Sequence, residues 1–102
     1  MSASILIQAP TTVEGDDDVA SAACILTEGL DVAVDLRSTE VLTAEGCRAL
    51  VRLQGVADET GRKLTLFGPQ RLVREVMVLS GVLDVIEVRD RQSSWFAGVR
   101  SR

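Results

Sequence analysis

Few side chains in this sequence could act as catalytic groups. The 102 residues contain no histidine or tyrosine and a single lysine, Lys63. Serine and cysteine nucleophiles that depend on a histidine base are therefore excluded. Asp35 and Glu40, a candidate acid–base pair, stand five positions apart across the predicted end of a strand, and nothing near them in the sequence suggests a pocket. The sequence therefore predicts a protein that is not an enzyme.

Residues that could hold a metal ion are also few. Cys24 and Cys47 match no zinc-binding spacing, and we expect both to be buried, reduced thiols. Three adjacent aspartates at 16–18 could suggest a metal site, but we favour a helix start, where carboxylates suit the positive end of the helix dipole. No glycine-rich phosphate-binding loop is present. We expect no metal and no cofactor.

Composition and charge favour a globular protein with a protein partner. Hydrophobic residues make up 46% and charged residues 25%, which is typical of one folded domain. The net charge of −4 argues against nucleic-acid binding. Acidic residues dominate 1–47 and basic residues dominate 48–102, a polarity that suits an electrostatically polarised partner. With no apolar run of membrane-spanning length and no secretory signal, we expect a cytoplasmic protein without direct membrane insertion.

Strand-like and helix-like segments alternate along the chain. Apolar or β-prone runs predict strands at 4–8, 11–15, 32–36, 63–68 and 84–88, and periodic patterns predict helices at about 17–28, 44–60 and 70–80. The second strand could pair with the first. The run "VAVDL" (32–36) is expected to be buried on both faces. Glycines at 29, 61 and 81 are expected at helix ends.

The third predicted helix has two further expected features. Pro69 suits its first helical position, because the fixed φ of proline helps there and its missing N–H costs nothing. The buried stripe of this helix is expected to consist of four aliphatic residues, Leu72, Val73, Val76 and Leu79.

These elements predict an α/β fold. The β-α alternation favours a four- to five-stranded, mostly parallel sheet with flanking helices and right-handed crossovers. The first strand or hairpin is expected at an edge. We expect one domain over 1–88 and a basic C-terminal tail over 89–102, which carries Trp95 and Phe96.

The stretch "VLTAEGCRALV" (41–51) contains the turn that leads into the longest helix. Thr43 can cap this helix through its hydroxyl, and Glu45 in the first turn suits the dipole. Leu50, Val51 and Leu53 are among the residues expected on its apolar side. The turn should be exposed and rich in free N–H groups, which makes it a natural place for a partner or a phosphate.

The order and spacing of several segments over residues 4–88 resemble the STAS domain, the fold of bacterial anti-sigma factor antagonists. "VEGDDDVASA" resembles the segment that opens the first helix in this family, and "VAVDL" resembles its central strand. "GRKLTLFGPQRLVREVMVLSGVLDVIEV" resembles its third strand and following helix. The resemblance implies a non-catalytic regulatory module that binds a kinase or another signalling partner through the turn near 40–52.

The usual regulatory switch of that family is not present in this turn. The family commonly has Asp-Ser-Ser-Gly, with the first serine phosphorylated, whereas this chain reads Thr43-Ala44-Glu45-Gly46. Ala44 stands at the phosphoacceptor position and cannot be phosphorylated, and Glu45 could mimic a constant negative charge. The resemblance implies a partner-binding set made of Ser38, Thr39, Thr43, Ala44, Glu45, Gly46, Arg48 and Arg52. Arg48 and Arg52 lie at i and i+4, so we expect mutual repulsion that an acidic partner would relieve.

Other functions remain open at this point. The alternative is an accessory STAS subunit of an Mla-type lipid-transport ABC transporter, docked on the ATPase, a role that does not need the phosphorylated serine. A scaffold role in a stressosome-like assembly is a third reading, and oligomers are possible.

Overall fold

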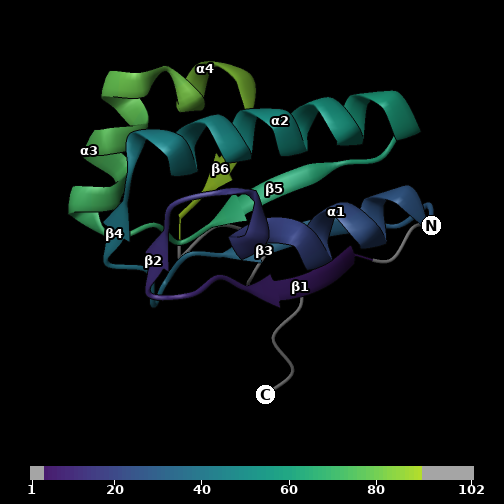
Figure 1. Ribbon diagram of the computed structural model, residues 1–102, viewed down its shortest axis with the longest axis horizontal. Coiled ribbons are helices and arrows are strands. Elements are labelled where there is room, and N and C mark those ends of the chain that lie inside the picture. Colours follow the sequence, from purple (N-terminus) through teal and green to yellow (C-terminus); the bar gives the residue numbers. More distant parts are fainter. Residues whose placement is uncertain (1–3, 91–102) are drawn as a thin grey trace.

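The computed structural model describes residues 4–90, and its centre is a four-stranded parallel sheet (Figure 1). The strands are β1 (Ser4–Gln8), β3 (Asp31–Asp35), β5 (Leu64–Phe67) and β6 (Glu87–Arg89). They lie in the order β1-β3-β5-β6, and all three pairings are parallel. The predicted α/β class, the parallel sheet and the edge position of the first strand are confirmed.

The strand β3 lies in the middle of this sheet, as the sequence predicted. Val32, Ala33 and Val34 are each 1% exposed, and β3 pairs with β1 on one side and β5 on the other. Val32 and Val34 belong to the main hydrophobic core, which they share with Leu64 and Leu66 of β5. An almost continuous apolar strand is the expected sequence of a strand buried on both faces.

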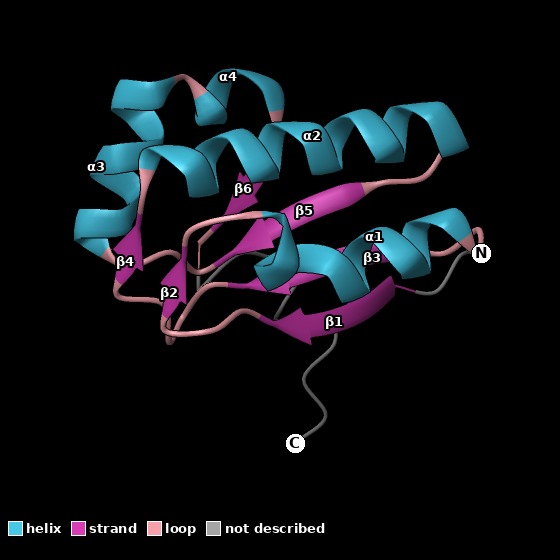
Figure 2. Cartoon of the chain, in the orientation of Figure 1, coloured by secondary structure: helices cyan, strands magenta, loops and turns pink. Residues whose placement is uncertain are grey.

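The helices gather on one side of the sheet, as Figure 2 shows. They are the 3₁₀ helix η1 (Asp16–Val19), α1 (Ala20–Thr27), α2 (Ala44–Thr60), α3 (Arg71–Ser80) and α4 (Val82–Val85). The predicted boundaries of α2 are confirmed. No helix within residues 4–90 combines the length and the apolar character needed to cross a bilayer.

A second, two-stranded sheet joins β2 (Thr12–Val13) to β4 (Val41–Leu42) in parallel. The expectation that the second strand pairs with the first is therefore wrong. The backbone N–H of Thr43 donates to the Val13 carbonyl at 3.1 Å, which continues this pairing to the start of α2. Pairing with β4 satisfies backbone groups of two segments that would otherwise both be loops.

The buried face of α3 is not the one that the sequence predicted. Its buried residues are Val73 and Met77, whereas Leu72 and Leu79 are 69% and 87% exposed. Six of its ten residues are apolar, so the sequence alone does not select one stripe. Pro69 also precedes the helix, because Gln70 is the N-cap.

The C-terminal prediction needs a similar correction. Gly81 ends α3 in the left-handed conformation, with φ 84°, and the next residues form the short helix α4 before the chain enters β6. The expected strand at 84–88 is therefore shifted to 87–89. Arg89, placed in the basic tail by the sequence, lies in the sheet, and residues 91–102 with Trp95 and Phe96 lie outside the described part of the chain.

Two further burial expectations are wrong. Cys24 is exposed on α1, while Cys47 is buried as predicted. Val51, expected on the apolar side of α2, is 43% exposed. In both helices the buried stripe is narrower than the run of apolar residues, and that width depends on the neighbouring helices.

Candidate functional site

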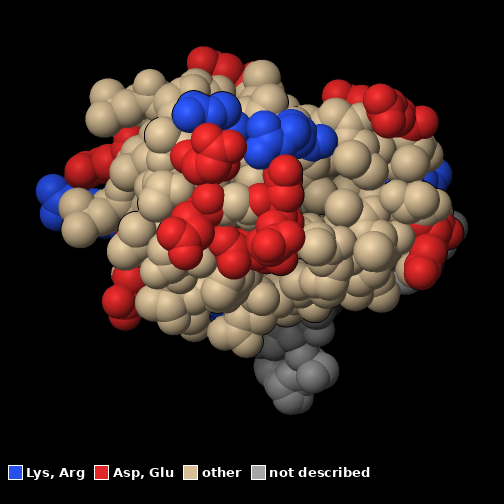
Figure 3. Space-filling view, viewed as in Figure 1, with Lys and Arg blue, Asp and Glu red and all other residues tan. Residues whose placement is uncertain are grey.

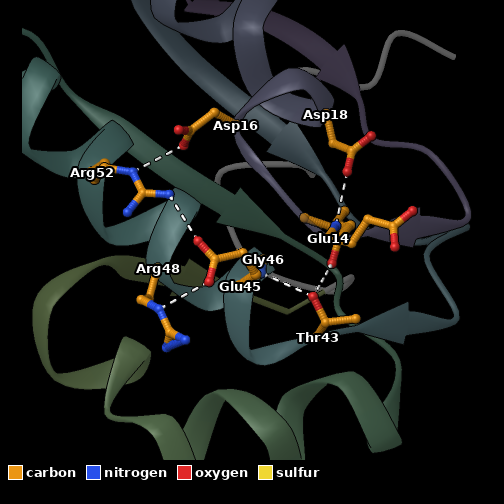
Figure 4. A network of polar contacts seen from close by, with 9 residues as sticks. Glu14, Asp16, Asp18, Thr43, Glu45, Gly46, Arg48 and Arg52 are labelled. Carbon is orange, nitrogen blue, oxygen red and sulfur yellow. Dashed lines mark hydrogen bonds and ion pairs between the residues drawn. The ribbon is translucent and has the colours of Figure 1, made fainter.

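The turn at 43–46 forms a capped helix start. The hydroxyl oxygen of Thr43 accepts from the backbone N–H of Gly46 at 3.0 Å, which satisfies one of the free donors of the first turn. The same hydroxyl lies 3.4 Å from the carbonyl oxygen of Val13, to which it donates (Figure 4). The capping role predicted for Thr43 is confirmed.

Gly46 is buried at the closest approach of α2 to β2. A side chain here would begin in the place of the Val13 backbone, 2.8 Å from its carbonyl carbon and closer still to its oxygen. No residue with a Cβ fits without a backbone shift. Gly46 thus sets the position of the turn, while its neighbours Ala44 and Glu45 are exposed.

The two arginines of the predicted site are already paired within the chain. The Arg48 guanidinium lies 3.1 Å from a Glu45 oxygen (Figure 4). Arg52 lies 3.0 Å from Asp16 of η1 and 3.6 Å from Glu45. The hydrogen bonds that the Arg52 guanidinium donates to Asp16 and Glu45 raise the pKa of Arg52, with the Asp16 contact the largest cause. The expected unrelieved repulsion between Arg48 and Arg52 is therefore wrong, because carboxylates neutralise both.

The surface around these arginines is acidic overall. Figure 3 shows acidic atoms gathered below a short row of basic atoms over the first half of α2. The acidic side includes Asp16, Asp17 and Glu14 beside Glu45, and the Asp18 carboxylate accepts from the Glu14 N–H at 2.8 Å. The three adjacent aspartates do start a helix, as expected, and one of them, Asp16, forms an exposed ion pair with Arg52 of α2.

The loop after β3 presents only one of its two predicted contact residues. Ser38 is exposed, and its hydroxyl oxygen accepts from the Gln8 side-chain amide at 3.2 Å. Thr39 is completely buried, and its hydroxyl donates to the Pro10 carbonyl at 2.7 Å. The side chain of Thr39 therefore holds the β1–β2 connection and does not lie on the surface.

A partly buried ion pair at the end of β3 was missed by sequence reasoning. Asp35 is 5% exposed. Its carboxylate oxygens accept hydrogen bonds from two guanidinium nitrogens of Arg37, at N–O distances from 2.8 to 3.2 Å. The hydrogen bond to Asp35 raises the pKa of Arg37, whose guanidinium also lies 5.2 Å from the centre of the Phe67 ring. The available signal was Asp35, the single charge in the otherwise apolar run at 32–36. The pair fixes the loop toward β4 and α2, which is a structural role.

A groove beside the turn completes the site. It has a volume of about 400 Å³ and runs between α2 and the end of α3. Three of its lining residues belong to the predicted partner-binding set: Ala44, Arg48 and Arg52. The others are Cys47 and Val51 of α2, which the sequence analysis placed in the interior or on the apolar side of the helix, and Ser80, which only the packing of α3 against α2 brings beside them. The groove thus has an apolar floor and a charged rim.

Comparison with known proteins supports the fold. No protein-family model matches the sequence, and no curated protein is significantly similar to it. Among solved structures, the chain is similar to a proposed anti-sigma factor antagonist from Thermotoga maritima, with a TM-score of 0.73 and 15% sequence identity. The match covers 96% of this chain and 88% of that one. The chain therefore has the STAS-like fold of anti-sigma factor antagonists.

Proposed function

We propose that this protein is a non-catalytic, regulatory protein-interaction module, similar to anti-sigma factor antagonists, that binds a kinase-like or other signalling partner near residues 40–52. The observation that carries the proposal is the groove of about 400 Å³ directly beside the turn. An apolar floor with a charged rim is the usual anatomy of a protein-binding surface. Exposed Ala44 and Val51 offer contact area, and the rim arginines are held in place by Glu45 and Asp16.

The interaction works without a phosphate on the turn. Ala44 has no hydroxyl, and the neighbouring Thr43 hydroxyl is engaged with Gly46 and Val13. We expect no stoichiometric phosphate on Thr43 after incubation with a cognate kinase and ATP, measured by mass spectrometry. A fully phosphorylated Thr43 would instead indicate a phosphorylation switch that acts one residue before the usual phosphoacceptor position.

The test uses two matched substitutions of exposed valines. Val51→Asp places a charge in the groove, and Val85→Asp places the same charge on α4; the two valines are 43% and 52% exposed. Wild-type protein and both variants serve as baits in a lysate of the source organism. A protein captured by wild type and Val85→Asp but not by Val51→Asp is then purified, and its affinity is measured by calorimetry. We expect Val51→Asp to weaken binding at least about tenfold.

Equal binding of the purified partner to wild type and Val51→Asp would contradict the proposal. The affinities are compared only if both variants melt like wild type, because a loss of thermal stability in Val51→Asp alone would weaken binding through unfolding. Circular dichroism melting of each bait supplies this control.

The second candidate is an accessory subunit of an Mla-type lipid-transport ABC transporter. Ala44 favours it, since such a subunit needs no phosphoacceptor. The identity of the captured protein distinguishes the two: a kinase-like or anti-sigma protein supports the first function, and a transporter ATPase supports the second. An adjacent kinase or sigma-factor gene, or adjacent ATPase and permease genes, would give the same distinction.

A further inference from the structure

The outer side of α3 is the most exposed apolar surface in the described part of the chain. Leu72 is 69% exposed, Val78 is 57% exposed and Leu79 is 87% exposed. Isolated surface leucines are common, but neighbouring exposed apolar side chains on one helix mark a binding surface. The residues that hold α3 to the protein, Val73 and Met77, lie on its other side.

The spacing of the two leucines suits pairing with an identical helix. Leu72 and Leu79 are seven residues apart, which is about two helical turns, so they lie on the same side of α3. Two copies related by a two-fold axis pair α3 with α3 in antiparallel orientation. Leu72 of one copy then packs against Leu79 of the other, and the symmetry makes this contact twice. Glu75 lies near the axis, with its charge balanced by Arg71 of the same helix at 3.7 Å.

The charges of α3 also suit an antiparallel copy. Its first turn contains Arg71 and Arg74 and no acidic residue, and its last turn contains no basic residue. This arrangement is unfavourable within one helix, because cations are stabilised at the negative C-terminal end. In an antiparallel pair, Arg71, which is 90% exposed, lies beside the C-terminal end of the other α3. Each copy thus brings Arg71, which also pairs with its own Glu75, to the helix end that has no basic residue in the other copy.

We propose that the exposed face of α3, made of Leu72, Glu75, Val78 and Leu79, is a homodimer interface that pairs α3 with the α3 of a second copy in antiparallel orientation. This surface is distinct from the partner-binding set around 40–52 and does not depend on the proposed function. The interface is small, so the dimer is weak, with a dissociation constant of roughly 10–100 µM.

Sedimentation velocity of the full chain tests the proposal. From about 5 µM to about 500 µM, the wild-type mass is expected to rise from 11.0 kDa toward twice that value. Leu79→Glu should raise the dissociation constant at least about tenfold, whereas Leu30→Glu, at a leucine 37% exposed in the α1–β3 loop, should leave it unchanged. A wild-type monomer at every concentration, or a Leu79→Glu variant that associates like wild type, would refute the interface.

Disulfide cross-linking tests the orientation. In a Cys24→Ser background, Glu75→Cys is expected to form a covalent dimer on oxidation, because residues near the axis can come within disulfide distance. Arg71→Cys should not, because in the antiparallel pair its two copies are separated by about 13 Å along the helix axes. A cross-link at position 71 would indicate a parallel pair, and the absence of a cross-link at 75 would also contradict the proposed arrangement.

Discussion

The outer face of α2 is charged and that of α3 is largely apolar, although the two helices pack against each other. The face of α2 carries Glu45, Arg48 and Arg52, and all three are paired within the chain. The face of α3 carries Leu72 and Leu79, which contact solvent. The sequence analysis placed the two arginines of α2 in a partner-binding set, yet their charges are already balanced within the chain. A binding surface is therefore better indicated by apolar side chains that remain exposed to solvent after folding, and α3 has more of these than α2.

The largest expected effect on stability concerns Gly46, which sets the position of the first turn of α2. Gly46→Ala should lower the free energy of unfolding by about 3 kcal/mol, because the added Cβ meets the Val13 backbone. Gly55→Ala, in the same helix with open space around it, should raise the free energy by about 0.5–1 kcal/mol. Urea denaturation of both variants measures the difference. Equal effects would mean that α2 does not depend on its close approach to β2.

The next prediction separates the two sides of α3. Met77→Ala should destabilise the protein by about 2–4 kcal/mol, because Met77 is fully buried in the core. Leu79→Ala should change the free energy of unfolding by less than about 0.5 kcal/mol at concentrations where the protein is monomeric. Thermal or urea denaturation at about 1 µM is the measurement. A large loss for Leu79→Ala in the monomer would show that this side chain is part of the core after all.

The two sides of α3 also show which features could not be predicted from the sequence. The pattern of apolar and polar residues was enough for the parallel sheet, for the cap at Thr43 and for the limits of α2. It was not enough for the phase of α3, since six apolar residues in ten fit more than one stripe. Nor could it locate Thr39 in the interior or pair Arg52 with Asp16, because those contacts join segments 29 and 36 positions apart. Local patterns determine elements, and the packing between elements determines which residues are available.

The smallest expected effect concerns the ion pairs of α2. In a double-mutant cycle, Asp16→Asn and Arg52→Gln should show a weak coupling, because both side chains are at least half exposed. Raising the salt concentration from about 0.05 M to about 1 M should remove most of that coupling. Thermal melts of the four proteins at both concentrations give the values. A strong, salt-independent coupling would mean that the pair is shielded from solvent and contributes to the fold.

The short ladder between β2 and β4 has a consequence for how the chain folds. The cap of α2 is a local motif, but its threonine also contacts Val13, thirty positions earlier in the chain. The N-terminal turn of α2 is therefore complete only after a loop of about thirty residues has closed. Closing this loop costs conformational entropy before the contact with Val13 can stabilise the structure. The two ends of α2 should form at different times: the end at Gly61 with neighbours in sequence, and the end at Thr43 only once β2 has arrived. Pulsed hydrogen exchange during refolding would then protect the amides of the last turns before the amide of Thr43, which donates to the Val13 carbonyl.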